Sequence, residues 1–414
     1  MKKRNPLFVI LFTVFLDMLG IGILIPVIPI LLADPSSTSY ILPAGMSIKT
    51  GYILLGLLIA IFPFMVFIAA PILGQMSDIF GRRKVLVISL AGTCLGYVIF
   101  AIAIMTKNIP LLFVSRALDG LTGGNISVAQ AVIADVTPPE KRARTFGLIG
   151  AAFGLGFIIG PFLGGVLADH RVVSWFNAST PFWFAAILSL INVALLILLL
   201  PETHIPIRNA SVEFNRSVKN IIRAFSHGDL RSIFTAAFIF QAGFAFYITF
   251  FGVFLIDRLS ATPGQIGLYF AYIGLWIVIA QVFVTRQLSH HFREDQVLRF
   301  SMIGMGIIIS IYIFLTEWWM LLIFAPFLAI SNGVTQANIP GLISRSSGRE
   351  VQGQVLGLNT SVQALAQSIP PVLSGIIAAI LTPEAPIIVS GITVILAGIF
   401  FVMMYKIPTR IKTD

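Results

Sequence analysis

Long apolar runs, separated by short polar or basic stretches, repeat along the whole chain. A bilayer core about 30 Å thick needs about 20 predominantly apolar residues in a helix. Each run that meets this length is predicted to be a membrane-spanning helix, and there are twelve: 6–32, 51–73, 85–106, 110–134, 145–168, 180–200, 232–256, 264–285, 297–316, 318–343, 353–381 and 385–406. The pattern predicts an all-α polytopic membrane protein.

The composition excludes most soluble classes. Only 11% of the 414 residues are charged and 57% are hydrophobic, whereas soluble domains carry roughly 25% charged residues. A soluble enzyme, a nucleic-acid binder or a disordered scaffold therefore fits poorly, despite the net charge of +10. The single cysteine, Cys94, lies in an apolar run and the five histidines lie in loops. We therefore expect no metal site, no cofactor and no nucleic-acid partner.

The basic residues predict the orientation in the membrane. With the N-terminus in the cytoplasm, 22 of the 27 Lys and Arg residues fall in cytoplasmic segments and one, Arg116, lies within a span. Only four face outward: Lys49, Lys107, Arg171 and Arg258. Cytoplasmic loops of membrane proteins are enriched in Lys and Arg. This asymmetry predicts that both termini lie in the cytoplasm. The short loops, without large appended domains, favour a plasma-membrane protein in the inner membrane of a bacterium.

The chain divides into two related halves. The longest cytoplasmic connection, 201–231, separates six spans in 1–200 from six spans in 232–414. Displacing the sequence by 210 residues places Gly123 on Gly333 and Pro161 on Pro371. Two parallel six-span repeats are typical of secondary transporters that bind substrate near the bilayer midplane. The chain has no GxxxxGK[ST] phosphate-binding sequence, so we do not expect ATP-driven transport.

The loop between the second and third spans carries the first specific resemblance. It resembles the loop motif Gly-x-x-x-Asp-Arg-x-Gly-Arg-Arg of the major facilitator superfamily, with Ile79 in place of the first arginine, and it matches at Gly74, Asp78, Gly81, Arg82 and Arg83. The resemblance implies the major facilitator fold. It also implies that Asp78 faces the start of the eleventh span, near Gly353, as part of a conformational gate. The alternative is a loop whose cations only set the topology.

Three ionisable residues lie within the predicted spans: Asp17, Arg116 and Asp119. Charges inside a bilayer are costly, so they usually face the protein interior and carry function. Arg116 and Asp119 are three residues apart on one helix and can pair. A carboxyl in a cavity that opens to alternate sides changes its proton affinity with its surroundings. We therefore expect proton coupling at Asp17 and Asp119, with a self-contained structural pair as the alternative. The run Arg116-x-x-x-Gly120 resembles the fourth-helix motif of the same superfamily, and this resemblance implies a part in proton coupling for Arg116.

Two further motifs are similar to those of the twelve-span drug/H+ antiporters, and the stretches 132–135 and 146–151 resemble those of the tetracycline-exporter branch of that family. Residues 16–29 read Leu-Asp-x-x-Gly-x-Gly-x-x-x-Pro-x-x-Pro, which is similar to that family's first-helix motif. The antiporter motif of the fifth span matches at Gly156, Gly160, Pro161, Gly164 and Gly165. The resemblance implies proton-coupled export of drugs or other small amphipathic compounds. Gly96 and Met305 stand where those exporters carry acids, so tetracycline itself is not expected as a substrate.

Uncharged polar and aromatic residues within the spans are the candidate lining of a substrate cavity: Asn125, Gln130, Gln241, Tyr247, Asn332, Gln336, Asn359 and Gln363. Amide groups beside aromatic rings suit an amphipathic, neutral or cationic organic molecule. The same side chains are also able simply to hold helices together.

Several other functions remain open at this point. We expect its partners to be the lipid bilayer, a small-molecule substrate and protons, and we expect the protein to be a monomer. Uptake or exchange of a metabolite, such as an amino acid, a sugar or a siderophore, is the first alternative. A sensor with a transporter fold is the second. A membrane enzyme would need a convergent set of catalytic groups, and the loops contain no such set, so we do not expect an enzyme.

Overall fold

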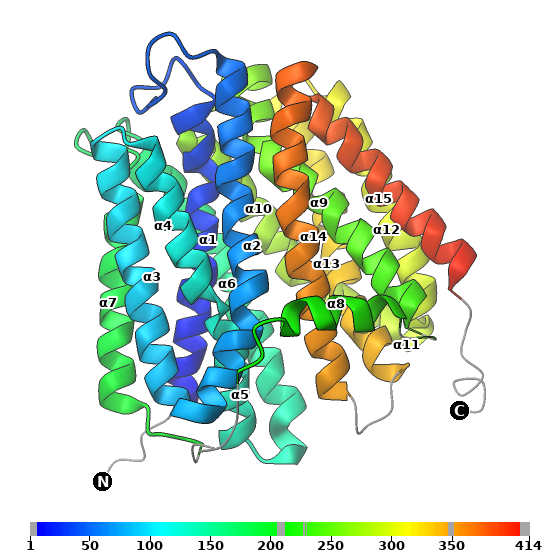
Figure 1. Ribbon diagram of the computed structural model, residues 1–414. Helices are drawn as coiled ribbons and strands as arrows, with labels where there is room; N and C mark the ends of the chain where they lie inside the picture. The colour runs from blue at the N-terminus through cyan, green and yellow to red at the C-terminus, as the bar shows by residue number, and fades with distance from the viewer. Residues whose placement is uncertain (1–5, 205–211, 227, 229, 347–351, 406–414) are drawn as a thin grey trace. The chain divides into compact units, whose positions relative to one another are not determined.

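The computed structural model describes residues 6–204, 212–226, 228, 230–346 and 352–405 (Figure 1). Within these ranges every regular element is helical. The α-helices are α1 (Pro6–Leu32), α2 (Ile48–Phe80), α3 (Arg82–Met105), α4 (Ile109–Thr122), α5 (Ile126–Val136), α6 (Pro139–Ala168), α7 (Thr180–Leu199), α8 (Arg216–Ser226), α9 (Arg231–Leu259), α10 (Pro263–Ile279), α11 (Thr285–His291), α12 (Glu294–Ile311), α13 (Trp318–Arg345), α14 (Gln352–Ile380) and α15 (Ala385–Met404). The predicted all-α class is confirmed.

Eleven helices among the described residues are long and apolar enough to cross a membrane. Each of them corresponds to one predicted span. The remaining predicted span, 110–134, is interrupted: α4 ends at Thr122, a 3₁₀ turn follows over Gly123–Asn125, and α5 begins at Ile126. A Cβ on Gly124 would lie 2.7 Å from the Ala70 Cα. The break therefore occurs where α2 approaches the backbone of this span too closely for a side chain.

The eighth predicted span is also irregular. Between α10 and α11 the helix widens into a π-helical segment, Ala280–Val284. A Cβ on Gly333 of α13 would lie 3.0 Å from both the Ala280 Cβ and the Ile277 carbonyl oxygen. Local π segments often mark functional sites. Here the widened turn lies where a neighbouring helix packs backbone to backbone.

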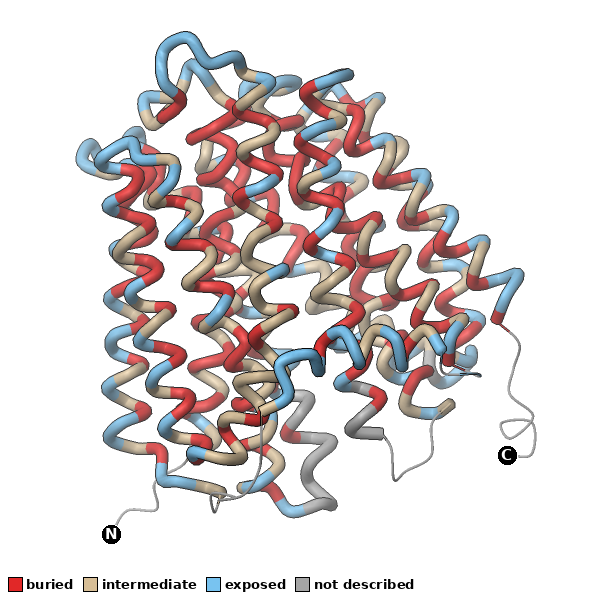
Figure 2. Tube along the Cα trace, in the orientation of Figure 1, coloured by how far each residue is buried: buried red, intermediate tan, exposed pale blue. Residues whose placement is uncertain are grey.

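The helices form two compact units. The first comprises residues 1–216 together with 262–271, and the second comprises 217–261 together with 272–414. The beginning of α10 thus packs with the first unit and the remainder of that helix with the second. Buried positions follow the inner faces of the helices, and exposed positions follow their outer faces and the loops (Figure 2).

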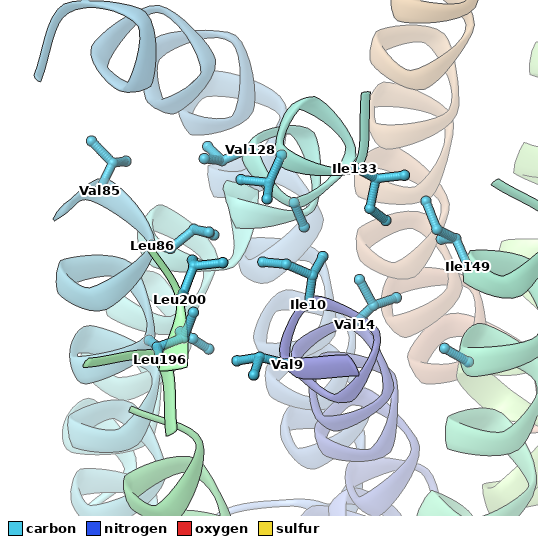
Figure 3. Packing of buried hydrophobic residues seen from close by; sticks show 14 residues of the cluster. Val9, Ile10, Val14, Val85, Leu86, Val128, Ile133, Ile149, Leu196 and Leu200 are labelled. Atoms are coloured by element: carbon cyan, nitrogen blue, oxygen red, sulfur yellow. The ribbon is translucent and has the colours of Figure 1, made fainter. Parts of the chain in front are cut away.

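An apolar cluster joins five helices of the first unit. Val9, Ile10 and Val14 of α1 face residues of α3, α5 and α7, among them Leu86 and Leu196 (Figure 3). Ile149 of α6 belongs to the same cluster. The cluster lies towards the N-terminal end of α1, so it holds that end of the helix on several sides.

Glycines bring α1 and α6 into direct backbone contact. A Cβ on Gly156 would lie 2.5 Å from the Met18 Cβ, one on Gly160 2.6 Å from the Leu19 carbonyl oxygen, and one on Gly164 2.5 Å from the Ile23 carbonyl oxygen. Three glycines at four-residue spacing thus form one groove along α6. Small residues at this spacing are how membrane helices approach closely.

Replacing Gly164 by alanine should destabilise the protein. The added Cβ would lie 2.5 Å from the Ile23 carbonyl oxygen, and overpacking of this kind typically costs about 1–3 kcal/mol. Gly150→Ala on the same helix is the matched control, because a Cβ there has nothing within 4 Å. Alanine is also the better helix former. Thermal unfolding in detergent should show a lower Tm for Gly164→Ala alone. Equal Tm values would contradict the close contact.

Candidate functional site

Arg116 and Asp119 form a buried ion pair on α4. The Arg116 Nη1 donates to the Asp119 Oδ2 at 2.6 Å, and the two side chains are 6% and 7% exposed. The guanidinium also lies over the Phe62 ring of α2, with its Cζ 4.3 Å from the ring centre. A buried charge is tolerated when it is paired. The structure therefore brings together the two residues that their spacing predicted to pair.

Asp17 on α1 is also buried, but only one of its two carboxylate oxygens accepts a hydrogen bond from the described residues. The Asn125 Nδ2 donates to its Oδ1 at 3.4 Å. Its Oδ2 has no hydrogen-bond partner among the described residues. Asp119 is close enough to interact with it electrostatically. The break between α4 and α5 is what positions Asn125 for this contact, because Asn125 is the last residue of the 3₁₀ turn.

Tyr97 on α3 belongs to the same site, although sequence reasoning missed it. Asp17, Thr93, Tyr97 and Ser189 line a small cavity with apolar residues of α1, α3 and α7. A Cβ on Gly20 would lie 1.6 Å from the Tyr97 Oη. The hydroxyl therefore lies against the bare backbone of α1, one turn after Asp17. A single tyrosine in an apolar span gives no pattern that would have singled it out.

Gly96 allows α3 and α4 to meet at Asp119. A Cβ on Gly96 would lie 3.3 Å from the Asp119 Cβ. The Ser115 hydroxyl donates to the Gly96 carbonyl oxygen at 2.7 Å. Gly96 therefore leaves the space beside Asp119 free of a side chain from α3, and the carboxylate at this contact comes from α4.

The loop motif forms a cluster of ion pairs around Arg82. The Arg82 Nη1 contacts the Asp78 Oδ1 at 2.6 Å, and its Nε contacts the Asp135 Oδ2 at the end of α5 at 3.3 Å. The Arg83 side chain instead donates to the Ile197 carbonyl oxygen. Gly74 has only the Ser127 hydroxyl near its Cβ position. The partner expected for Asp78, near Gly353, lies outside the residues whose side chains the structure describes.

Glu202 caps the first turn of α3. Its Oε1 accepts from the Arg82 N–H at 2.8 Å and its Oε2 from the Arg83 N–H at 3.2 Å. A carboxylate at a helix N-terminus is stabilised by the free N–H groups and the helix dipole. Gly81 makes room for it: its φ is +97°, and a Cβ there would lie 2.5 Å from the Glu202 Oε2. Glu202 lies far from this loop in sequence, which is why sequence reasoning missed it.

The antiporter motif contacts a second helix besides α1. A Cβ on Gly165 would lie 2.4 Å from the Pro263 carbonyl oxygen, and one on Gly267 would lie 2.3 Å from the Pro161 carbonyl oxygen. The motif therefore packs α6 between α1 and the beginning of α10. Its glycines are explained by packing on both sides of the helix.

The expected cavity residues lie in different environments. In the second unit the Gln336 Nε2 donates to the Gln241 Oε1 at 3.0 Å. The side-chain oxygens of Asn332 and Asn359 are buried and have no hydrogen-bond partner among the described residues. The other three, Gln130, Tyr247 and Gln363, are respectively exposed, fully buried in an aromatic cluster, and half-buried. Asn125 is the member of the expected set that donates a hydrogen bond to an acid, Asp17.

The comparisons with known proteins agree with this architecture. The family model described as "Major Facilitator Superfamily" matches residues 10–286 and 233–413. The class C tetracycline resistance protein of Escherichia coli is 34% identical over 90% of this chain and 89% of its own length. The quinolone resistance protein NorA of Staphylococcus aureus is 25% identical over 97% of both chains.

Solved structures support the fold. The human organic anion transporter MFSD10 has a TM-score of 0.71 at 20% identity, over 97% of this chain and 100% of that one. A D-xylose-proton symporter has a TM-score of 0.75 at 17% identity, over 96% of this chain and 97% of that one. This chain is a multi-pass membrane transporter. It belongs to the major facilitator superfamily.

The contact between Gly20 and Tyr97 can be tested by a double-mutant cycle. Gly20→Ala should lower the Tm, because the new Cβ would lie 1.6 Å from the Tyr97 Oη. In a Tyr97→Leu background the same change should cost less, since the ring is gone. Residues in direct contact show coupling energies of about 0.5–3 kcal/mol. If the decreases in Tm caused by the two substitutions simply add in the double variant, the two residues are not in contact.

Proposed function

We propose that this chain is a proton-coupled exporter of small amphipathic organic compounds, working by alternating access. The observation that carries the proposal is a buried Asp17, with one carboxylate oxygen unpartnered among the described residues, beside the buried Arg116–Asp119 ion pair. The relatives named for tetracycline and quinolone resistance support an exported drug as the substrate. The antiporter motif on α6, which packs against the helix that carries Asp17, supports the direction of transport.

Asp17 is the residue at which substrate and proton would compete. One of its carboxylate oxygens is buried without a partner, and a buried charge without full compensation is costly. Either a proton or a cationic group of the substrate would relieve that cost. Arg116 and Asp119 would stay paired with each other. Binding of a proton or of a cationic group at Asp17 would then change the net charge of the site by one.

The remaining parts of the proposal follow from the sequence. The halves 1–200 and 232–414, joined by 201–231, would be the bodies whose rearrangement exposes Asp17 to each side in turn. The loop of Asp78 and Arg82 would bias that rearrangement. We place the protein in a bacterial inner membrane, as a monomer with both termini in the cytoplasm. No chemical conversion of the substrate is part of this function.

Transport in liposomes tests the proposal. Purified protein is reconstituted in vesicles that contain a pH-sensitive dye, and a proton gradient is imposed. Lipophilic cations, a fluoroquinolone, tetracycline, sugars and amino acids are then added one at a time. We expect a lipophilic cation or the fluoroquinolone to trigger proton movement, and Asp17→Asn to abolish it. Asp257→Asn, which removes an exposed acid at the end of α9, is the matched control and should transport normally.

Other outcomes would reject the proposal in distinct ways. Proton-driven transport that survives the combined Asp17→Asn and Asp119→Asn changes would remove these acids from coupling. Compounds that cross without proton movement would indicate a facilitator. A response to sugars or amino acids alone would indicate a metabolite transporter.

Moving the acid of position 119 on α4 to position 96 on α3 tests whether coupling needs a carboxylate at this place. Because the Cβ positions of residues 96 and 119 are 3.3 Å apart, Gly96→Asp should partly restore coupled transport to an Asp119→Ala protein. Gly96→Asn in the same background is the uncharged control and should restore nothing. Asp119→Ala leaves Arg116 buried without its ion-pair partner, which typically costs about 3–5 kcal/mol, so the Tm of each variant must be measured. A folded Gly96→Asp, Asp119→Ala protein that shows no recovery would contradict the exchange.

A further inference from the structure

The linker predicted over 201–231 contains a helix that the sequence analysis did not predict. Helix α8, Arg216–Ser226, runs across α14 (Figure 1). The Asn220 Nδ2 donates to the Ser361 Oγ of α14 at 3.2 Å. The Phe225 ring lies edge-on to the Phe238 ring of α9, with centres 5.9 Å apart. One side of α8 is therefore attached to two membrane-spanning helices of its own unit.

A second side of α8 is apolar and exposed. Val218 is 54% exposed and Ile222 is 63% exposed, and Phe214, just before the helix, is 75% exposed. Val218 and Ile222 are four residues apart, so they lie along one line of the helix surface. The row is displaced by about a third of a turn from the buried residues Ser217 and Ala224.

A third side of α8 is basic. Arg216, Lys219 and Arg223 are exposed and lie together, about a third of a turn beyond the apolar row. Helix α8 contains no acidic residue. Neither Arg216 nor Arg223 has an ion-pair partner among the residues that the structure describes. The surface of the helix thus carries a protein-facing, an apolar and a cationic sector.

We propose that α8 lies in the inner leaflet of the membrane and binds anionic phospholipid headgroups. The apolar row would enter the acyl-chain region beside α14, while Arg216 and Arg223 would contact headgroup phosphates. Three sectors are what a helix needs when protein, hydrocarbon and headgroups meet around it. Basic residues beside membrane helices are attracted to the anionic lipids of the cytoplasmic leaflet. A soluble protein partner would not require an apolar row on a helix that is attached to two membrane-spanning helices. The inference rests on the cytoplasmic placement of the linker proposed above.

Spin labels test the depth of the helix. Single cysteines at 218, 222, 219 and 223 are introduced into a Cys94→Ala protein, labelled, and reconstituted in vesicles of phosphatidylglycerol and phosphatidylcholine. Labels at 218 and 222 should collide mainly with oxygen, and labels at 219 and 223 mainly with a water-soluble nickel chelate. A label at Ser36, in an exposed loop, is the aqueous reference. Nickel accessibility at 218 and 222 equal to that at Ser36 would overturn the proposal.

Lipid selectivity tests the headgroup contact. Native mass spectrometry in mixed micelles should show phosphatidylglycerol retained in preference to phosphatidylcholine. The Arg216→Gln, Arg223→Gln protein should lose that preference by roughly tenfold. The matched control is Lys49→Gln with Lys107→Gln, which removes two exposed charges elsewhere and should keep it. Equal retention by both variants would overturn the headgroup site. Neither measurement involves transport, so failure here leaves the exporter proposal standing.

Discussion

The close approach of α1 to its neighbours is the constraint on which the candidate site depends. In a bilayer, helices are not driven together by the hydrophobic effect, so packing of small residues decides which helices touch. Gly156, Gly160 and Gly164 hold α6 against one side of α1. Tyr97 of α3 occupies the space left by Gly20 of α1. The turn that carries Asp17 is therefore held by backbone contacts, and the carboxylate has little freedom to reach a partner elsewhere.

Within that frame the two buried acids are unequal. Asp119 is matched by Arg116 at 2.6 Å, which is the condition for keeping both charges in a low-dielectric interior. Among the described residues, Asp17 has one long hydrogen bond, from Asn125 at 3.4 Å. The proposed exchange of protons or cations would require a group whose charge is not already compensated. Asp17 is the acid of the two that has this property among the described residues.

Helix α5 links this site to the loop between α2 and α3. Asn125, which contacts Asp17, immediately precedes α5, and Asp135, which contacts Arg82, lies near its end. The helix between them is eleven residues long. Glu202 anchors the same loop by capping α3. The Asp17 contact and the ion pairs of the loop therefore lie at the two ends of one short helix.

The sequence by itself determined what depends on local chemistry. The length of each apolar run predicted the spans, and the three-residue spacing predicted the pairing of Arg116 with Asp119. The motifs indicated the superfamily. Only the tertiary structure decided what depends on distant residues: the break at Gly123–Asn125, the contact of Tyr97 with Gly20, the cap by Glu202 and the nearness of Gly96 to Asp119. The reason is physical. A helix in lipid forms from its own hydrogen bonds, which residues four apart complete, whereas the position of each polar side chain depends on neighbouring helices that can be more than a hundred residues away in the chain, as Asn125 is from Asp17.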